Sequence, residues 1–179
     1  MADAGGASAL PDPVDDPHSR QRVVFRRNDP GELQVELSVG RGGFVRDHIH
    51  LSQVETFEVV AGSFTLDLDG KRRTLEAGSS FTVPSRASHG FPPAADDVQL
   101  LVTIRPALEL AGYFRDFLTL SRDGRLRVPE SGLPRPILLF AVLMDRYRDE
   151  IAVPGLPLWL QRPVFRVLAR IGRLLGHTL

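Results

Sequence analysis

The chain has 179 residues, of which 42% are hydrophobic and 25% are charged, and its formal net charge is zero. This is the composition of an ordinary globular protein, so it excludes wholesale disorder, and the neutral balance gives no bulk attraction to nucleic acid. The absence of cysteine excludes disulfides, thiolate zinc sites, iron–sulfur clusters and a catalytic thiol, so any metal must be held by nitrogen and oxygen ligands.

The N-terminal segment, residues 1–20, is rich in Ala, Gly, Pro and Asp, and we expect it to form a disordered acidic tail. It lacks a basic start followed by an apolar run, so it does not resemble a secretory signal. The longest apolar run, residues 137–144, is much shorter than the roughly 18 residues of a membrane span. We therefore expect a cytoplasmic protein.

Residues 21–106 contain short runs rich in β-branched and aromatic residues, many of which alternate apolar with polar side chains. Asp69 and Gly70 separate two of these runs and predict a hairpin turn, because glycine accepts the positive φ that a tight turn needs. Many short strands with regular turns predict a β-sandwich or small barrel. The alternating strand–helix pattern of a nucleotide-binding fold is absent, as is a phosphate-binding glycine loop.

Residues 107–179 change to a helical period. Three segments, 107–124, 135–151 and 157–179, read as helices, so we predict a mainly β domain followed by about three C-terminal helices. Pro163 interrupts the last segment, either in the first turn of a new helix or at a kink.

Two histidines, His48 and His50, lie one residue apart in a predicted strand and therefore point to the same face. Glu55 follows at the entry to the next strand, and its carboxylate can reach the same point if the two strands pair. His89 is a further candidate ligand, distant in the sequence. The other two histidines, His18 and His177, are expected to be solvated at the surface.

The spacing around these histidines resembles the first motif of the cupin superfamily, G(x)5HxH(x)3,4E(x)6G. Every specified position of that motif is present, at Gly42, His48, His50, Glu55 and Gly62.

The second cupin motif, G(x)5PxG(x)2H(x)3N, is matched in register by Gly78, Pro84 and His89. Arg86 stands in place of the third specified residue, glycine, and Pro93 in place of the final asparagine. Both departures lie at positions that shape the backbone and leave the metal ligand in place.

The resemblance covers roughly residues 20–106 and implies a double-stranded β-helix, a jelly-roll barrel that binds one divalent metal ion inside. The ligands carried over position by position are His48, His50, Glu55 and His89. Imidazole and carboxylate ligands suit Fe, Zn, Mn, Ni or Cu, and we expect Fe. The resemblance also implies a homodimer.

Strand alternation places further side chains near the expected metal. Phe44 and Arg46 share a face with the two histidines if the strand is regular, Phe57 shares a face with Glu55, and Phe91 lies two residues after His89. These four residues are candidates for substrate binding. Each is equally well explained as a barrel-core residue or, for Arg46, as a surface charge displaced by a bulge.

The last predicted helix carries arginines on one face and a broad apolar face opposite, with no acidic residue. One interpretation is a basic amphipathic helix on a membrane surface. The other, which we favour, is a helix packed against residues 137–144, with its arginines solvated or paired to Asp145, Asp149 and Glu150.

Three classes of function are compatible with these features. The expected one is a metal-dependent enzyme, dioxygenase-like, that acts on a small phenolic, dicarbonyl or carboxylate substrate with Glu55 as ligand and base. Isomerase or cyclase chemistry also occurs on this fold. The alternatives are a non-catalytic module that binds or senses a small ligand, and a protein that acts through its basic C-terminal helix. No helix-turn-helix for DNA binding is evident.

Overall fold

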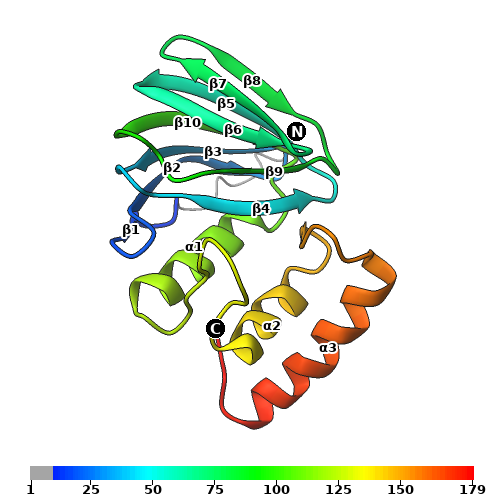
Figure 1. Ribbon diagram of the computed structural model, residues 1–179. Coiled ribbons are helices and arrows are strands. Elements are labelled where there is room, and N and C mark those ends of the chain that lie inside the picture. The colour runs from blue at the N-terminus through cyan, green and yellow to red at the C-terminus, as the bar shows by residue number, and fades with distance from the viewer. Residues whose placement is uncertain (1–9) are drawn as a thin grey trace, which may run out of the picture.

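The computed structural model describes residues 10–179, which form two facing antiparallel sheets followed by three helices (Figure 1). The six-stranded sheet has the order β1 (Val14–Asp16), β2 (Gln21–Asp29), β3 (Glu32–Val39), β10 (Val98–Arg105), β5 (Val54–Ala61) and β8 (Ser80–Val83). The five-stranded sheet has the order β11 (Ile151–Ala152), β4 (Val45–His50), β9 (Ser88–Phe91), β6 (Ser63–Leu68) and β7 (Lys71–Glu76). The predicted jelly-roll barrel with C-terminal helices is confirmed.

The barrel core follows from the alternation of apolar and polar residues within the strands. In β10, which pairs with β3 on one side and β5 on the other, Leu100, Val102 and Ile104 are at most 2% exposed. The side chains between them face outward and are more exposed. Burying one such aliphatic side chain contributes about 1.5–3 kcal/mol, so the inward face of each strand ties the two sheets together.

The predicted hairpin lies between β6 and β7. Asp69 and Gly70 form its two-residue loop, with φ values of 47° and 75°. Positive φ at both loop residues is the turn geometry whose twist matches that of the paired strands.

The expected disordered tail is partly ordered. Residues 1–9 lie outside the described residues, but Val14–Asp16 form strand β1, which pairs antiparallel with β2. Val14 is buried in the core, and the buried Asp16 carboxylate accepts hydrogen bonds from the His18 amide and the Ser19 hydroxyl. Pairing with β2 and burial of Val14 therefore order a part of the segment that composition alone predicted to be disordered.

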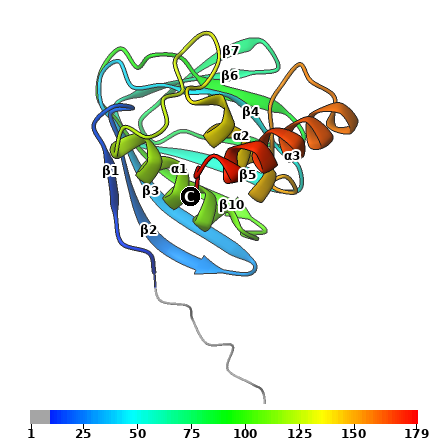
Figure 2. The same cartoon turned by 90° about the horizontal axis from the view of Figure 1, so that it is seen from below.

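The three helices are α1 (Leu110–Arg122), α2 (Ile137–Arg146) and α3 (Leu158–Leu174). Pro163 lies inside α3, which continues through it as one helix. The apolar helix α2 is central: α1 contacts one part of it, and α3 packs along another. Figure 2 shows α3 as the outermost of the three, and the chain end returns toward α1, where the Arg125 guanidinium donates to the Thr178 carbonyl (2.6 Å).

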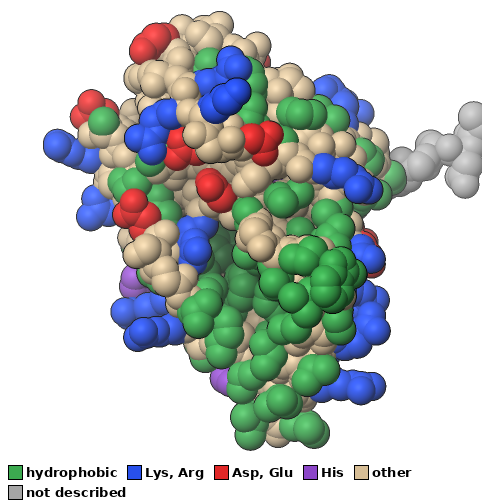
Figure 3. Space-filling model, turned by 45° about the vertical axis from the view of Figure 1, so that its right-hand side comes forward, with side chains coloured by type: hydrophobic (Ala, Val, Ile, Leu, Met, Phe, Trp, Pro, Cys, Tyr) green, Lys and Arg blue, Asp and Glu red, His purple; other side chains and the backbone are tan. Residues whose placement is uncertain are grey.

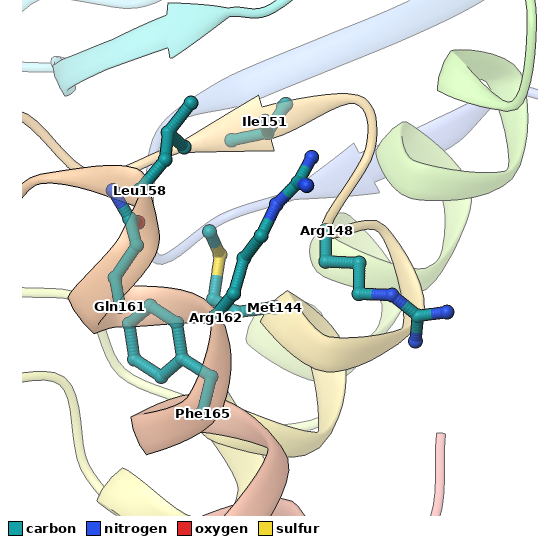
Figure 4. Close-up of a pocket in the computed structure, with 7 residues that line it drawn as sticks. All are labelled: Met144, Arg148, Ile151, Leu158, Gln161, Arg162 and Phe165. Carbon is teal, nitrogen blue, oxygen red and sulfur yellow. The ribbon is translucent and has the colours of Figure 1, made fainter.

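The helix α3 is held against α2 partly by the ion pairs that the sequence suggested. Arg173 lies 2.9 Å from the buried Asp145 of α2, and Arg162 lies 2.9 Å from Asp149. Glu150 instead accepts a hydrogen bond from the side-chain amide of Gln53. The packing is close: the crevice between α2, β11 and the start of α3 has a volume of about 10 Å³, enough for roughly one water molecule (Figure 4).

Strand β11 connects the helical region to the barrel. Ile151 and Ala152 pair with His50 and Ile49 of β4, and the Leu51 amide donates to the Glu150 carbonyl. The segment after α2 therefore extends the sheet that carries the histidines. None of the helices in residues 10–179 combines the length and apolar composition that crossing a membrane requires.

Candidate metal centre

The three candidate histidines lie on neighbouring strands of the five-stranded sheet. His48 and His50 belong to β4, and His48 lies opposite His89 of β9. Between Val45 and His48 the register shifts, so that Arg46 and Asp47 face the single residue Gly90. A Cβ at Gly90 would lie 2.6 Å from the Val45 carbonyl oxygen, so this β-bulge needs glycine opposite it.

Glu55 comes from the other sheet. It is the second residue of β5, where it pairs with Ile104 of β10 and Val83 of β8, and it does not lie on a strand beside β4. The expected strand pairing is therefore not the reason that its carboxylate meets the histidines. The carboxylate reaches them across the barrel interior, so the group of four residues joins the two sheets.

The side chains of His48, His50, Glu55 and His89 converge. Each offers one ligand atom, and these four atoms all lie within 4.8 Å of one another. The Nε2 atoms of His48 and His50 are 3.2 Å apart, and a carboxylate oxygen of Glu55 lies 2.8 Å from His89 Nε2 and 3.4 Å from His50 Nε2. Ligands about 2.1 Å from one metal ion lie roughly 3–4 Å from each other, so the spacing fits a shared ion.

Backbone hydrogen bonds set the tautomers of two of the rings. Nδ1 of His48 lies 3.0 Å from the Arg46 carbonyl oxygen, and Nδ1 of His89 lies 3.1 Å from the Ala87 carbonyl oxygen. Because a carbonyl only accepts, each Nδ1 carries a proton and donates it, which leaves Nε2 as a lone-pair donor in the neutral ring. The Nε2 lone pairs and a carboxylate oxygen of Glu55 therefore point at the same place. They repel one another unless a proton or a cation lies between them.

Burial and mutual contact shift the pKa values of the group. Burial, together with the neighbouring His89 and His50, lowers the pKa of His48 to about 3, so its ring is neutral. For Glu55, burial raises the pKa, but its interactions with His50 and His89 outweigh burial and hold the pKa well below its usual range. Burial lowers the pKa of His89, but the hydrogen bond and charge of Glu55 outweigh it and raise the pKa. Without a metal, Glu55 and His89 therefore share a proton that a cation can replace.

An aromatic group lies beside these residues inside the barrel. The ring of Phe57 is 6.4 Å from that of His89 and 5.3 Å from that of Phe64, which in turn lies 5.4 Å from Phe91. Phe57 and Phe91 therefore face inward, as their strand positions indicated. Phe64 was not among the predicted site residues, although its alternation with Leu66 in β6 indicated its inward direction.

The other two predicted substrate residues do not join this group. The bulge adds a residue to β4, so the alternation that placed Arg46 inward is wrong. Its guanidinium donates to the Gly132 carbonyl (2.6 Å), in the segment between α1 and α2. Val45, rather than Phe44, packs against the barrel core, and the Phe44 carbonyl accepts a hydrogen bond from Gln21.

The motif glycines occupy left-handed backbone. Gly42, Gly62 and Gly78 have φ values between 80° and 84°, a conformation in which a Cβ costs about 1–2 kcal/mol. Arg86, which stands where the second motif has glycine, keeps the same conformation with φ of 68°. Its amide donates to the His50 carbonyl (2.7 Å), so the turn before His89 is retained without its glycine.

The part of the chain that carries the site is similar to a known protein family. The family model described as "Cupin domain" matches residues 34–104, which include all four converging residues. The matched segment ends before α1, so the helices lie outside it. A comparison with curated proteins gives no match.

Solved structures also resemble the chain. KdgF from Halomonas sp. is 24% identical, with 52% of this chain and 84% of that chain covered and a TM-score of 0.48. An RmlC-like cupin from Shewanella frigidimarina NCIMB 400 is 23% identical, with 61% and 92% covered and a TM-score of 0.49. The cupin domain of Schizosaccharomyces pombe Cnp3 is 13% identical, with 59% and 72% covered and a TM-score of 0.46.

Proposed function

We propose that this chain, whose barrel is a cupin domain, binds one divalent metal ion through His48, His50, Glu55 and His89 and is an enzyme acting on a small organic molecule. The observation that carries the proposal is the convergence of three imidazoles and one carboxylate, with ligand atoms within 4.8 Å of one another inside the barrel. Two of the imidazoles are already fixed by backbone carbonyls in the tautomer that a metal requires.

The donor set fits a transition-metal ion. Neutral imidazoles with one carboxylate suit Fe, Zn, Mn, Ni or Cu, and the absence of thiolates disfavours none of these. We propose Fe, with a dioxygenase-like reaction. A bound ion of this kind acts as a Lewis acid on a substrate oxygen and, in the case of Fe, supplies redox chemistry.

Glu55 limits the kinds of proton that the site can remove. Its pKa lies well below the usual range, so the carboxylate is ionised at neutral pH and is a weak base. Because proton transfer is efficient when donor and acceptor pKa values are close, so weak a base would remove a proton only from a group whose pKa a bound cation has lowered. The oxygens of phenols and enolisable 1,3-dicarbonyl compounds bind a cation as anions, so we propose these compounds as the substrate class.

The aromatic side chains favour the same substrate class. Phe57, Phe64 and Phe91 are each at most 6% exposed and contact one another in a row that begins with Phe57 beside His89. Such walls exclude water and favour a substrate with an aromatic or alkyl body.

The close contacts of the same three rings favour a second candidate function. Phe64 lies within 5.5 Å of both Phe57 and Phe91, so these rings fill the interior that they line. A site with little room suits a module that binds or senses a small ligand without transforming it.

We also propose a compartment and an oligomeric state. The lack of cysteine favours the cytoplasm, and the family resemblance favours a homodimer.

The test begins with elemental analysis of full-length protein purified without added metal. We expect near-stoichiometric metal in the wild type and in His18→Ala, whose histidine is exposed, and almost none in His50→Ala/His89→Ala. Wild type that contains no metal and gains none on titration would overturn the proposal. With metal present, uptake of O₂ with catechols or 1,3-diketones supports a dioxygenase, and substrate binding without O₂ uptake or product supports the binding module instead.

A further inference from the structure

Helix α3 exposes a continuous apolar surface. Trp159, Leu160, Val164, Val167, Ile171, Leu174 and Leu175, which we name the α3 apolar face, are between 36% and 87% exposed. Their spacing of three, four and seven residues puts them on one side of the helix. Figure 3 shows apolar side chains gathered over the lower part of the molecule, where α3 lies, with basic side chains at the sides. Contiguous apolar patches on a surface mark interaction sites.

The contact of α3 with α2 does not use this face. The residues of α3 that are buried are Gln161, Ala169 and Gly172, of which two are small and one is polar. A Cβ at Gly172 would lie 3.0 Å from the Leu138 carbonyl oxygen of α2, so the two helices approach closely along this line. The packing that we expected between the helices therefore exists, but it leaves most of the apolar residues of α3 facing outward.

The arginines of α3 divide into two pairs. Arg162 and Arg173 are neutralised within the chain by Asp149 and Asp145. Arg166 and Arg170 make no ion pair with any residue from 10 to 179, and they lie about two turns and one turn before Leu174, at the border of the α3 apolar face. No acidic residue follows Glu150 in the sequence. The face is thus apolar with uncompensated positive charge at its edge.

We propose that the α3 apolar face docks on the surface of an anionic lipid bilayer. Charge complementarity carries this choice: a lipid surface supplies both the apolar phase and the negative headgroups that Arg166 and Arg170 lack within the chain. A second copy, docked helix against helix, would bring basic edges together with no acidic residue of either α3 to compensate them. Trp159, which is 76% exposed, lies at the basic edge of the face, as indole rings do at a membrane interface.

This inference goes beyond the proposed function, because it assigns a location to the enzyme through residues that the metal centre does not use. β11 pairs with His50 and Ile49 and precedes α3 by a short loop, so docking of α3 would hold the barrel next to the bilayer. A substrate with an apolar body, of the kind that the barrel favours, concentrates in such a layer.

The test is co-sedimentation of the full-length protein with vesicles of phosphatidylcholine mixed with phosphatidylglycerol, and with vesicles of phosphatidylcholine alone. We expect the wild type to bind the mixed vesicles. Arg166→Gln/Arg170→Gln removes two charges from the border and should weaken this binding about 30-fold, since each arginine near an anionic surface contributes about fivefold. Val167→Ser/Leu174→Ser, which keeps the charge, should weaken it by at least about tenfold.

A matched control separates the α3 surface from net charge. Arg22→Gln/Arg26→Gln removes two exposed arginines from β2 and should change binding by less than about twofold. All the substituted side chains are exposed, so circular dichroism and metal content should equal those of the wild type in every variant. The proposal is overturned if the wild type binds neither vesicle or if the β2 control loses as much binding. It is also overturned if sedimentation equilibrium without lipid shows a dimer that Val167→Ser/Leu174→Ser dissociates, because a second copy then covers the face.

Discussion

The barrel strands and helix α3 both have a clear apolar side and a clear polar side, but the apolar side is buried in the barrel and exposed on α3. In the barrel, apolar side chains of β10 such as Leu100 and Ile104 are at most 1% exposed. In α3, Leu174 is 87% exposed and Val167 is 57% exposed, while the small residues Ala169 and Gly172 are buried. The two regions show that periodicity defines a face but does not say what covers it.

The polar residues of the two regions show the same contrast. In the barrel, Glu55 and His89 are buried and are compensated by each other. On α3, Arg166 and Arg170 are exposed and have no acidic partner among residues 10–179. Because a buried charge is costly unless paired, the barrel residues must form a defined group, whereas the arginines are free to meet an external partner.

The largest effect that we expect from a single substitution is at Glu55. Glu55→Gln keeps the size of the side chain but removes the only anion among the four converging residues. Since residues that merely support a ligand already contribute 10- to 100-fold to metal affinity, loss of the ligand charge should weaken metal binding by at least about 100-fold. Titration of metal-free protein, followed by calorimetry, measures this change.

Glu58→Gln is the matched control, because it makes the same change on the outward side of the same strand. It should bind metal as the wild type does. Equal losses of metal affinity in both variants would mean that the charge of the barrel as a whole, and not the inward carboxylate, attracts the ion. The inward and outward faces of β5 would then not differ in their effect on the metal.

A stability change of intermediate size should result from Gly172→Leu. The larger side chain would enter a contact in which even a Cβ lies 3.0 Å from the Leu138 carbonyl oxygen and 3.1 Å from a Val142 methyl carbon. Overpacking of this kind costs about 1–3 kcal/mol, which thermal unfolding can detect. Val167→Leu, on the exposed side of the helix, should leave the melting temperature unchanged. If Val167→Leu destabilised the protein as much, the α3 apolar face would already be packed, contrary to its exposure.

The smallest expected effect is a pH-dependent one at Glu150, where the helical region meets the barrel. Burial is the main cause of its raised pKa, above the usual 4.5. A carboxyl group with a raised pKa binds its proton more tightly in the folded state, so its contribution to stability falls as pH rises from 4.5 through the raised value. Glu150→Gln removes this cost and should melt at a slightly higher temperature than the wild type at about pH 7, with the difference shrinking toward about pH 4.

Asp149→Asn provides the comparison for this measurement, because Asp149 is the exposed neighbour of Glu150 and pairs with Arg162. Its melting temperature should differ little from that of the wild type, with no rise specific to neutral pH. A Glu150→Gln variant that is less stable than the wild type at neutral pH would show that the charged carboxylate, through its bond to Gln53, stabilises the junction instead.

The sequence was sufficient for those features that depend on local chemistry. Alternation located the barrel strands, and the pair Asp69-Gly70 located a hairpin because few residues accept positive φ. The HxH spacing and the fixed distance to Glu55 indicated the candidate ligands through the cupin resemblance. The predicted positions of the helices were also close to those observed, because the change of period near residue 107 is pronounced.

Tertiary structure decided the features that depend on which element packs against which. The bulge opposite Gly90 turned Arg46 away from the histidines, since one added residue reverses every later side chain of a strand. The carboxylate of Glu55 reached the site from the facing sheet, and β11 joined the histidine strand through only two residues, too few for a pattern to reveal. The sequence showed that α3 has an apolar side, but only the structure showed that this side is exposed. The contact with α2 runs along the side that carries Ala169 and Gly172, where small residues allow the two backbones to lie close together.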